Sequence, residues 1–254
     1  MSRADLISYL LQERGEKWDG RLSAEEEKRL YRSLVNVRPP YPVSEEYLKK
    51  EDEYLQGRLF ERGIVRLSDL TFDEDGIALW QGDITRLQSD AVVNAANKEL
   101  LGCFAPCHAC IDNCIHTYAG VRLRLSCDEL MRAQGHDEPT GVAKITPAYN
   151  LPSKYVLHTV GPIVSGRLTE KNKSDLRSCY VSCLDLAVKN GLESVAFCCI
   201  STGVFGFPND EAAKIAVRTV RDFKARTGSG IKVIFDVFKK YDYELYRQLL
   251  EKNR

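Results

Sequence analysis

The sequence has no net charge and no long hydrophobic run. Lys plus Arg number 36 and Asp plus Glu also number 36, so the protein lacks an overall field that would attract nucleic acid or an anionic membrane. No apolar stretch approaches the roughly 20 residues that a membrane-spanning helix needs. We therefore expect neither nucleic acid nor a membrane as a partner.

The N-terminus lacks the features of a secretory signal. Its apolar run, in residues 1–11, is interrupted by Asp5, and no small-residue cleavage site follows. We therefore expect a cytoplasmic protein, in which thiols stay reduced. The chain has nine cysteines, an odd number that suits a disulfide framework poorly. In a reducing compartment, clustered cysteines more often bind metal or take part in chemistry than form disulfides.

The first seventy residues differ from the rest of the chain. Residues 23–26 carry a capping-box pattern, and the helix that it predicts ends before the PPYP segment. Ser44 can cap a second helix. Charges are dense here and no catalytic constellation is present. We interpret residues 1–70 as a helical N-terminal extension that packs on a main domain of residues 71–254.

In the main domain, short apolar runs alternate with amphipathic segments. One such helix buries a stripe from Leu176 to Val188 and ends at Gly191, the next uses Asn209 as N-cap, and the last begins near Asp242. Strands that alternate with helices predict a mainly parallel sheet covered on both faces. Five apolar runs predict its buried strands: IALWQGDIT, DAVVNAAN, KYVLHTVGP, SVAFCCIS and KVIFDVF.

Ligands of such sheets bind beyond the carboxyl ends of the strands, and polar residues follow several of these ends. Residues 201–208, STGVFGFP, lie between a strand and a helix, where free backbone N–H groups and the helix dipole can bind an anion such as phosphate. Phe205 and Phe207 could supply an aromatic face beside it. Asn94 and Asn97 are either turn residues or hydrogen-bonding partners for sugar hydroxyls.

The motifs GDIT, VVNAAN, CIDNCIHTYAG, TGVAKITPAYNLPSKYVLHTVGP and CISTGVFGFP occur in this order and together resemble the macrodomain family. The resemblance covers roughly residues 72–254. It implies a three-layer α/β/α sandwich with a mixed, mostly parallel sheet, here with the helical N-terminal extension added. It also implies ADP-ribose as the ligand.

By this resemblance, each part of ADP-ribose has expected partners. Asp83 would hold the adenine amino group with the Ile84 backbone beside it, and Phe238 would lie against the adenine. Asn97 would contact the distal ribose. The diphosphate would be wrapped by the segment after the fourth predicted strand: Ser201, Thr202, Gly203, Val204 and Phe205.

The segment LLGCFAPCHACIDNCIH, residues 100–116, replaces the glycines of typical macrodomains and resembles the zinc-containing branch of the family. That branch implies one zinc per chain, bound by Cys103, His108 and Cys110. Two thiolates and an imidazole suit zinc, and three protein ligands leave a fourth position open. Asp112, just beyond the loop, could accept a proton there.

The remaining cysteines and histidines leave alternatives. Cys107 and Cys110 form a C-x-x-C pair that could be redox-active, although no thioredoxin-like context surrounds it. Cys107 could also be a fourth ligand that closes the metal site, although adjacent ligands would strain the loop. His136 is expected in a solvated loop. We interpret the others as structural or packing residues: Cys114, Cys127, Cys179, Cys183, Cys198, Cys199, His116 and His158.

The resemblance predicts a zinc-dependent hydrolase that removes mono-ADP-ribose from acidic side chains, with Asn97 and Asp112 as catalytic residues. An O-acetyl-ADP-ribose deacetylase and a non-catalytic ADP-ribose reader are the alternatives. In some members the resemblance also implies partners. These are a lipoate-bearing relative of the glycine cleavage H protein as the modified target, and a sirtuin-type transferase that modifies it.

Overall fold

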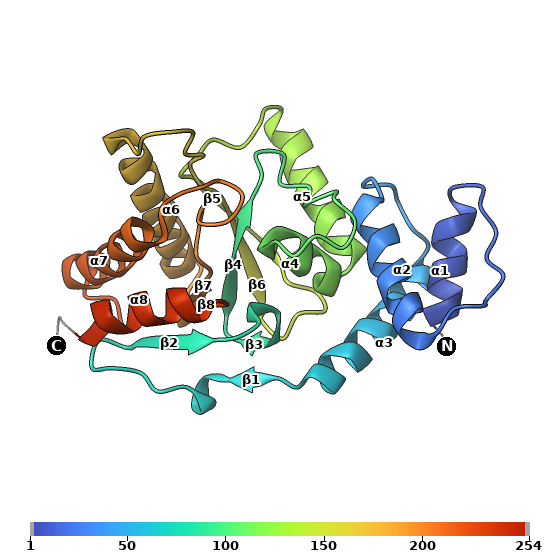
Figure 1. Cartoon of the computed structure of the whole chain (residues 1–254), viewed down its shortest axis with the longest axis horizontal. Helices are drawn as coiled ribbons and strands as arrows, with labels where there is room; N and C mark the ends of the chain where they lie inside the picture. The colour runs from blue at the N-terminus through green and yellow to red at the C-terminus, as the bar shows by residue number, and fades with distance from the viewer. Residues whose placement is uncertain (1–2, 252–254) are drawn as a thin grey trace.

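A six-stranded sheet forms the centre of the computed structural model, which describes residues 3–251 (Figure 1). Its strand order is β2-β8-β7-β4-β6-β5, and only β5 runs antiparallel to its neighbour. The mixed, mostly parallel sheet is therefore confirmed. The strands are β2 (Ile77–Gln81), β4 (Ala91–Ala96), β5 (Ala143–Pro147), β6 (Tyr155–Val160), β7 (Ser194–Phe197) and β8 (Lys232–Val237).

All five predicted strands are present, and β5 is the strand of this sheet that the sequence pattern missed. The central strands β4 and β7 are almost wholly buried and read as continuous apolar runs, as expected for parallel strands covered on both faces. β5 is an edge strand whose residues are mostly half-buried and whose last residue is a proline. Its sequence therefore lacks the apolar run that identifies the others.

Helices cover both faces of the sheet. Figure 1 shows α6, α7 and α8 side by side on one side, with α4 and α5 on the other. This arrangement is the expected three-layer sandwich. The helices are α4 (Ile111–Ala119), α5 (Val121–Gln134), α6 (Glu170–Lys189), α7 (Asn209–Thr227) and α8 (Lys240–Glu251). No helix within residues 3–251 is both long and apolar enough to cross a membrane.

Two details of these helices differ from the prediction. Val188 is 43% exposed, because the buried stripe of α6 passes from Leu184 to Ala187 and leaves Val188 at its edge. Asn209 is the first residue of α7 rather than its N-cap, which is Pro208. The Asn209 side chain instead donates a hydrogen bond of 2.6 Å to Asp242 Oδ1 and ties α7 to α8.

The N-terminal extension contains three helices: α1 (Arg3–Gln12), α2 (Ala24–Val37) and α3 (Glu45–Arg62). Both predicted N-caps are confirmed: Ser23 forms a complete capping box, and Ser44 accepts from the Tyr47 N–H. The sequence did not predict α1. Its apolar residues are buried against α2 and α3 in a second core, separate from that of the sheet.

The extension is attached to the main domain by buried contacts. Val121 of α5 belongs to the second core, and its N–H donates 2.9 Å to Glu51 Oε2 of α3. Two short strands follow α3: β1 (Val65–Arg66) pairs in parallel with β3 (Leu87–Gln88). Short 3₁₀ turns follow β1 and β2, at Leu67–Asp69 and Ile84–Arg86. The expected domain limits at residues 1 and 254 lie outside the described residues, and the boundary at residue 70 stays a prediction.

Candidate functional site

The carboxyl ends of the parallel strands bring most of the predicted site residues to one edge of the sheet. Asp83 follows β2, Asn97 follows β4, Ser201 follows β7 and Phe238 follows β8. Because parallel strands all end on the same side, residues that are far apart in sequence meet there. We refer to this side as the carboxyl edge of the sheet.

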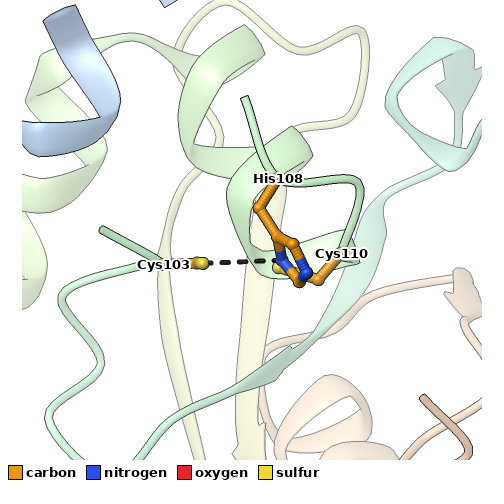
Figure 2. A group of neighbouring side chains, drawn as sticks. All are labelled: Cys103, His108 and Cys110. Atoms are coloured by element: carbon orange, nitrogen blue, oxygen red, sulfur yellow. Dashed lines mark hydrogen bonds between the residues drawn. The ribbon is translucent and has the colours of Figure 1, made fainter. Parts of the chain in front are cut away.

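The cysteine loop, residues 100–110, connects β4 to α4 and lies at this edge. Figure 2 shows the side chains of Cys103, His108 and Cys110 pointing toward one another. Their sulfur and nitrogen atoms all lie within 4.8 Å of one another, and the Cys103 Sγ to His108 Nδ1 distance is 3.7 Å. The loop therefore brings together the three residues that the sequence predicts as metal ligands.

The spacing of these atoms fits zinc. With Zn–S near 2.3 Å and Zn–N near 2.1 Å, tetrahedral geometry separates a sulfur from a nitrogen ligand by about 3.6 Å. The observed 3.7 Å requires almost no rearrangement. Burial raises the pKa of the Cys110 thiol to about 12, and the nearby Cys103 also raises it. Without a cation the Cys110 thiol would thus stay protonated, whereas a coordinated thiol loses its proton.

Cys107 does not belong to this group. Its φ of +54° is in the left-handed region, and its thiol lies 3.4 Å from the backbone carbonyl of Arg29 in α2. The cluster contains Cys103, His108 and Cys110 without Cys107. The structure therefore favours the three-ligand arrangement over a site closed by a fourth cysteine.

Asp112 lies in the first turn of α4 and is almost completely buried. Its Oδ1 accepts a hydrogen bond of 2.8 Å from Asn94 Nδ2. Burial raises the pKa of Asp112 to about 6, while the Asn94 hydrogen bond and the Arg124 charge oppose the shift. Asn94 is fully buried in β4 and contacts His158 Nδ1 as well, so its amide orients Asp112 from behind.

Two buried histidines lie behind Asp112. His158 binds Thr146 through Nε2 at 2.9 Å, and burial lowers its pKa to about 3. His116 Nε2 lies 3.6 Å from Asp112 Oδ1, and burial lowers its pKa well below the usual value. Both imidazoles are therefore neutral near pH 7. The prediction that they are structural residues agrees with these positions.

Asn97 lies between β4 and the cysteine loop. Its Nδ2 donates 2.9 Å to the Gly102 carbonyl, and its Oδ1 is buried without a partner. Gly102 has φ +82°, and a Cβ there would come within 2.8 Å of the His116 ring. The loop can pass this close to α4 only with glycine at residue 102. Asn97 keeps an amide oxygen free of protein partners.

The glycine loop, residues 201–207, follows β7. Ser201 has φ +65° and is buried, and its Oγ has no hydrogen-bond partner. The loop is closed by its own backbone: the Phe207 N–H donates 3.0 Å to the Ser201 carbonyl. Val204 is 79% exposed at the tip. Phe207 is buried in the core, so the suggestion that it offers an aromatic face to a ligand is wrong.

Asp83 and Phe238 lie at the end of the edge formed by β2 and β8. Asp83 caps the turn that contains Ile84, accepting from the Thr85 N–H at 3.0 Å and the Thr85 hydroxyl at 2.6 Å. Phe238 is 78% exposed, and its carbonyl accepts 3.2 Å from Gln81 Nε2. An accessible ring and a partly exposed carboxylate thus lie on neighbouring strand ends.

The N-terminal extension contributes residues that sequence reasoning missed. Arg62 of α3 donates to Asp83 Oδ2 at 3.0 Å and to Thr85 Oγ1 at 2.9 Å, with its guanidinium 3.6 Å from the Tyr118 ring centre. Arg32 of α2 contacts the cysteine loop and also lies 3.5 Å from Cys114 Sγ. Cys114 therefore faces α2 rather than the core of its own helix, which corrects the prediction for it.

The other cysteines do not support a redox pair. All nine are free, and Cys107 and Cys110 have different partners, because Cys110 Sγ accepts from the Asn113 N–H at the start of α4. Cys199 is partly buried. The other four cysteines predicted to pack in the core are buried: Cys127, Cys179, Cys183 and Cys198. His136 is exposed, as expected for a loop residue.

Comparison with known proteins agrees with this geometry. The Macro domain model matches residues 93–216. A protein-ADP-ribose hydrolase from Treponema medium is 54% identical over 254 residues, covering 98% of this chain and 97% of the relative. One of the same name from Staphylococcus aureus strain MSSA476 is 52% identical over 226 residues, covering 88% of this chain and 85% of the relative.

Solved structures show the same fold. The Trypanosoma brucei macrodomain in complex with ADP-ribose superimposes with a TM-score of 0.66 at 32% identity, covering 91% of this chain and 97% of that one. The match of fold and sequence places this α/β/α sandwich in the macrodomain class. The chain belongs to the Macro domain family.

Proposed function

We propose that the chain is a protein-ADP-ribose hydrolase that releases mono-ADP-ribose from acidic side chains of modified proteins. Two kinds of observation support the proposal. Relatives more than half identical over most of the chain carry that name. The side chains of Cys103, His108 and Cys110, which could hold a metal, also converge in the loop that follows Asn97 and precedes Asp112.

The observation that carries the proposal is the convergence of Cys103, His108 and Cys110 beside Asp112. A module that only reads ADP-ribose needs no metal-ligating cluster next to a buried carboxylate. These three residues would hold one zinc ion, and a bound zinc with an open position supplies Lewis acidity to an oxygen ligand. Its two thiolate ligands would keep that acidity moderate.

The residues of the carboxyl edge would bind the substrate in order. Asp83 would accept from the adenine amino group, Phe238 would cover the base, and the glycine loop would wrap the diphosphate. Ser201 offers a buried hydroxyl without a protein partner, and Gly203 leaves the approach to the loop open because no atom lies where its Cβ would be. Binding the distant adenine and diphosphate positions the reacting ribose, which lowers the entropic cost of reaction.

Asn97 and Asp112 would act at the distal ribose. The buried Oδ1 of Asn97 has no protein partner and is available for a ribose hydroxyl. Asp112 would take a proton from the attacking water, and Asn94 holds its other oxygen in place. Water breaks the bond between the ribose and the acidic side chain. The acidic side chain leaves as a carboxylate, ADP-ribose keeps the hydroxyl of the water, and Asp112 returns the proton that it took to solvent.

We also propose, from the family resemblance alone, that the modified protein is a lipoate-bearing relative of the glycine cleavage H protein. A sirtuin-type transferase would be the enzyme that modifies it. Incubation of the purified enzyme with such a carrier, modified on an acidic residue, tests this choice. Release of ADP-ribose from this carrier faster than from an unrelated modified protein is the expected result.

A single comparison tests the main function. The zinc-loaded protein is incubated with a protein ADP-ribosylated on glutamate, and separately with O-acetyl-ADP-ribose. We expect release of free ADP-ribose from the modified protein. The rate of this release should fall clearly in Asp112→Asn. Tight binding of ADP-ribose without turnover of either substrate would show a reader. Turnover of the acetylated ester alone would show a deacetylase.

A further inference from the structure

Cys107 and His108 are adjacent and both can bind zinc, yet only His108 faces the other two ligands. Successive side chains of a loop point in different directions, so a rotation of the segment would exchange the two. A thiolate binds zinc at least as readily as an imidazole. The preference for His108 must therefore come from contacts outside the ligand cluster.

Helix α2 holds this dipeptide at both ends. Asn36 Oδ1 accepts 2.9 Å from the Cys107 N–H, and Arg32 Nη2 donates 2.8 Å to the His108 carbonyl. The Cys107 thiol lies 3.4 Å from the Arg29 carbonyl. Residues 29, 32 and 36 are spaced by three and four, so they share one face of the helix. A single helix face thus fixes the orientation of both peptide groups.

Arg32 also supports the rest of the cysteine loop. Its Nη2 donates 2.9 Å to Asn113 Oδ1, and Asn113 Nδ2 in turn donates to the carbonyls of Cys103 at 3.3 Å and Ala105 at 3.0 Å. Asn113 is fully buried. The first expected ligand, Cys103, and the second, His108, are therefore both connected to the guanidinium of Arg32.

The conformation that turns Cys107 away is unfavourable by itself. Residues other than glycine rarely adopt the left-handed region, because Cβ then lies too close to the following carbonyl oxygen. Cys107 has φ +54° and can stay there only while surrounding contacts offset that cost. The hydrogen bond that Asn36 accepts from Cys107 and the one that Arg32 donates to His108 are those contacts.

We propose that α2 of the N-terminal extension determines which of two neighbouring side chains binds the metal, holding His108 in the site and Cys107 out of it. The inference rests on the zinc site of the proposed function. Arg32 and Asn36 are positioning residues, because they act on the ligand loop and do not touch the metal. Loss of this hold would let Cys107 replace His108 and give a site with three thiolates. Such a site carries one more negative charge and polarises a bound oxygen less.

The test replaces zinc with Co²⁺ and measures the thiolate-to-cobalt charge-transfer band, whose intensity reports the number of thiolate ligands. The wild type is expected to show two thiolates. Arg32→Ala is expected to gain about half as much intensity again, because a third thiolate joins two. Arg32→Lys keeps the charge but cannot reach both acceptors, and a smaller increase is expected. If Arg32→Ala does not fold, the band of Arg32→Lys is measured in its place.

The decisive variant is Arg32→Ala combined with Cys107→Ser, which should return the band to its wild-type intensity. Lys28→Ala is the matched control, because Lys28 is a cation of the same helix that pairs with Glu25. An unchanged band in both Arg32 variants would overturn the inference, and so would a gain that persists without the Cys107 thiol. A wild type that binds neither Co²⁺ nor Zn²⁺ would instead overturn the metal site itself.

Discussion

Two loops on the carboxyl edge are held in different ways. The cysteine loop is anchored by another region of the chain, since α2 donates to or accepts from Cys107, His108 and Asn113. The glycine loop is closed mainly by its own backbone, with one further hydrogen bond from the Val164 N–H to the Phe205 carbonyl. The Oγ of Ser201 has no hydrogen-bond partner, and Val204 at the tip is exposed. We expect the first loop to be fixed before any ligand binds and the second to complete its hydrogen bonds with the ligand.

This difference corresponds to two tasks. A metal site depends on ligand atoms held within a few tenths of an ångström, so contacts around the ligands are needed as much as the ligands themselves. A diphosphate is bound by many N–H groups, whose approach requires a loop with few competing partners. Changes at the cysteine loop should therefore alter metal content, whereas changes at the glycine loop should alter nucleotide affinity alone.

The largest expected effect is loss of the metal. In Cys103→Ala or Cys110→Ala, zinc content measured by elemental analysis should fall from near one per chain to near zero. Hydrolysis should fall by more than about a hundredfold, because even indirect contacts to a metal are worth about ten- to a hundredfold. Cys107→Ala is the matched control and should keep its zinc. A metal-free wild type with full activity would contradict this prediction.

A smaller effect, confined to the other loop, is expected from Gly161→Ala. A Cβ at Gly161 would lie 2.0 Å from Ser201 Oγ, so the glycine loop must move. Overpacking of this kind costs about 2 kcal/mol, and ADP-ribose affinity measured by calorimetry should fall about thirtyfold. Zinc content should not change. Gly230→Ala, where a Cβ meets no atom within 4 Å, provides the control.

Behind the cysteine loop, the buried His158 should make the stability of the protein depend on pH. His158 lies behind Asp112, and its pKa of about 3 is below the usual value of 6.5 because of burial. The unfolded chain therefore binds more protons between these values, so stability present above pH 6.5 is lost as pH falls toward 3. His158→Gln should make stability depend less steeply on pH there, by up to about 1.4 kcal/mol per unit.

Denaturant unfolding at several pH values measures this slope. His136→Gln is the matched control, since His136 is exposed and has the same chemistry. Equal slopes for His158→Gln and the wild type would show that folding does not lower the pKa of His158. Glutamine can keep one of the two hydrogen bonds that join His158 to Asn94 and Thr146, which limits the loss of stability at neutral pH.

The smallest expected effect tests whether the extension also supports the adenine end. Arg62→Ala removes a partly exposed ion pair with Asp83, and such pairs contribute about 0.2–1 kcal/mol. ADP-ribose affinity should fall about threefold. The preference over the inosine analogue, which lacks the amino group, should decrease. Arg58→Ala is the control, because Arg58 pairs with Glu61 on the same helix. If Arg62→Ala keeps the full preference for ADP-ribose over the inosine analogue, the extension does not position Asp83.

The sequence predicted the parts of the site that lie in short segments. Cys103, His108 and Cys110 fall within eight residues, so one loop had to bring them close. The predicted strands and both caps of the extension depend on local pattern, which the structure confirms. Motif order also placed Asp83, Asn97 and Ser201 after three of the predicted strands, and parallel pairing then brought the ends of those strands to one edge of the sheet.

The contacts that depend on tertiary packing could not be predicted. Arg32 is 81 residues from Asn113, and no local spacing relates an arginine in a charged helix to a distant loop. Phe207 and Asn209 were misassigned because a motif does not reveal which side chains turn inward. The helix α1 was not predicted, because its apolar run is short and the core that buries it is supplied by α2 and α3.

Helix α2 takes part in two structures at once. Tyr31, Leu34 and Val35 lie in the second core, while Arg32 and Asn36 contact the cysteine loop. Occupancy of the ligand cluster and docking of the extension are therefore linked equilibria, and by reciprocity each must strengthen the other by the same factor. A chelator added to the folded protein should consequently loosen the first three helices, although none of them supplies a ligand.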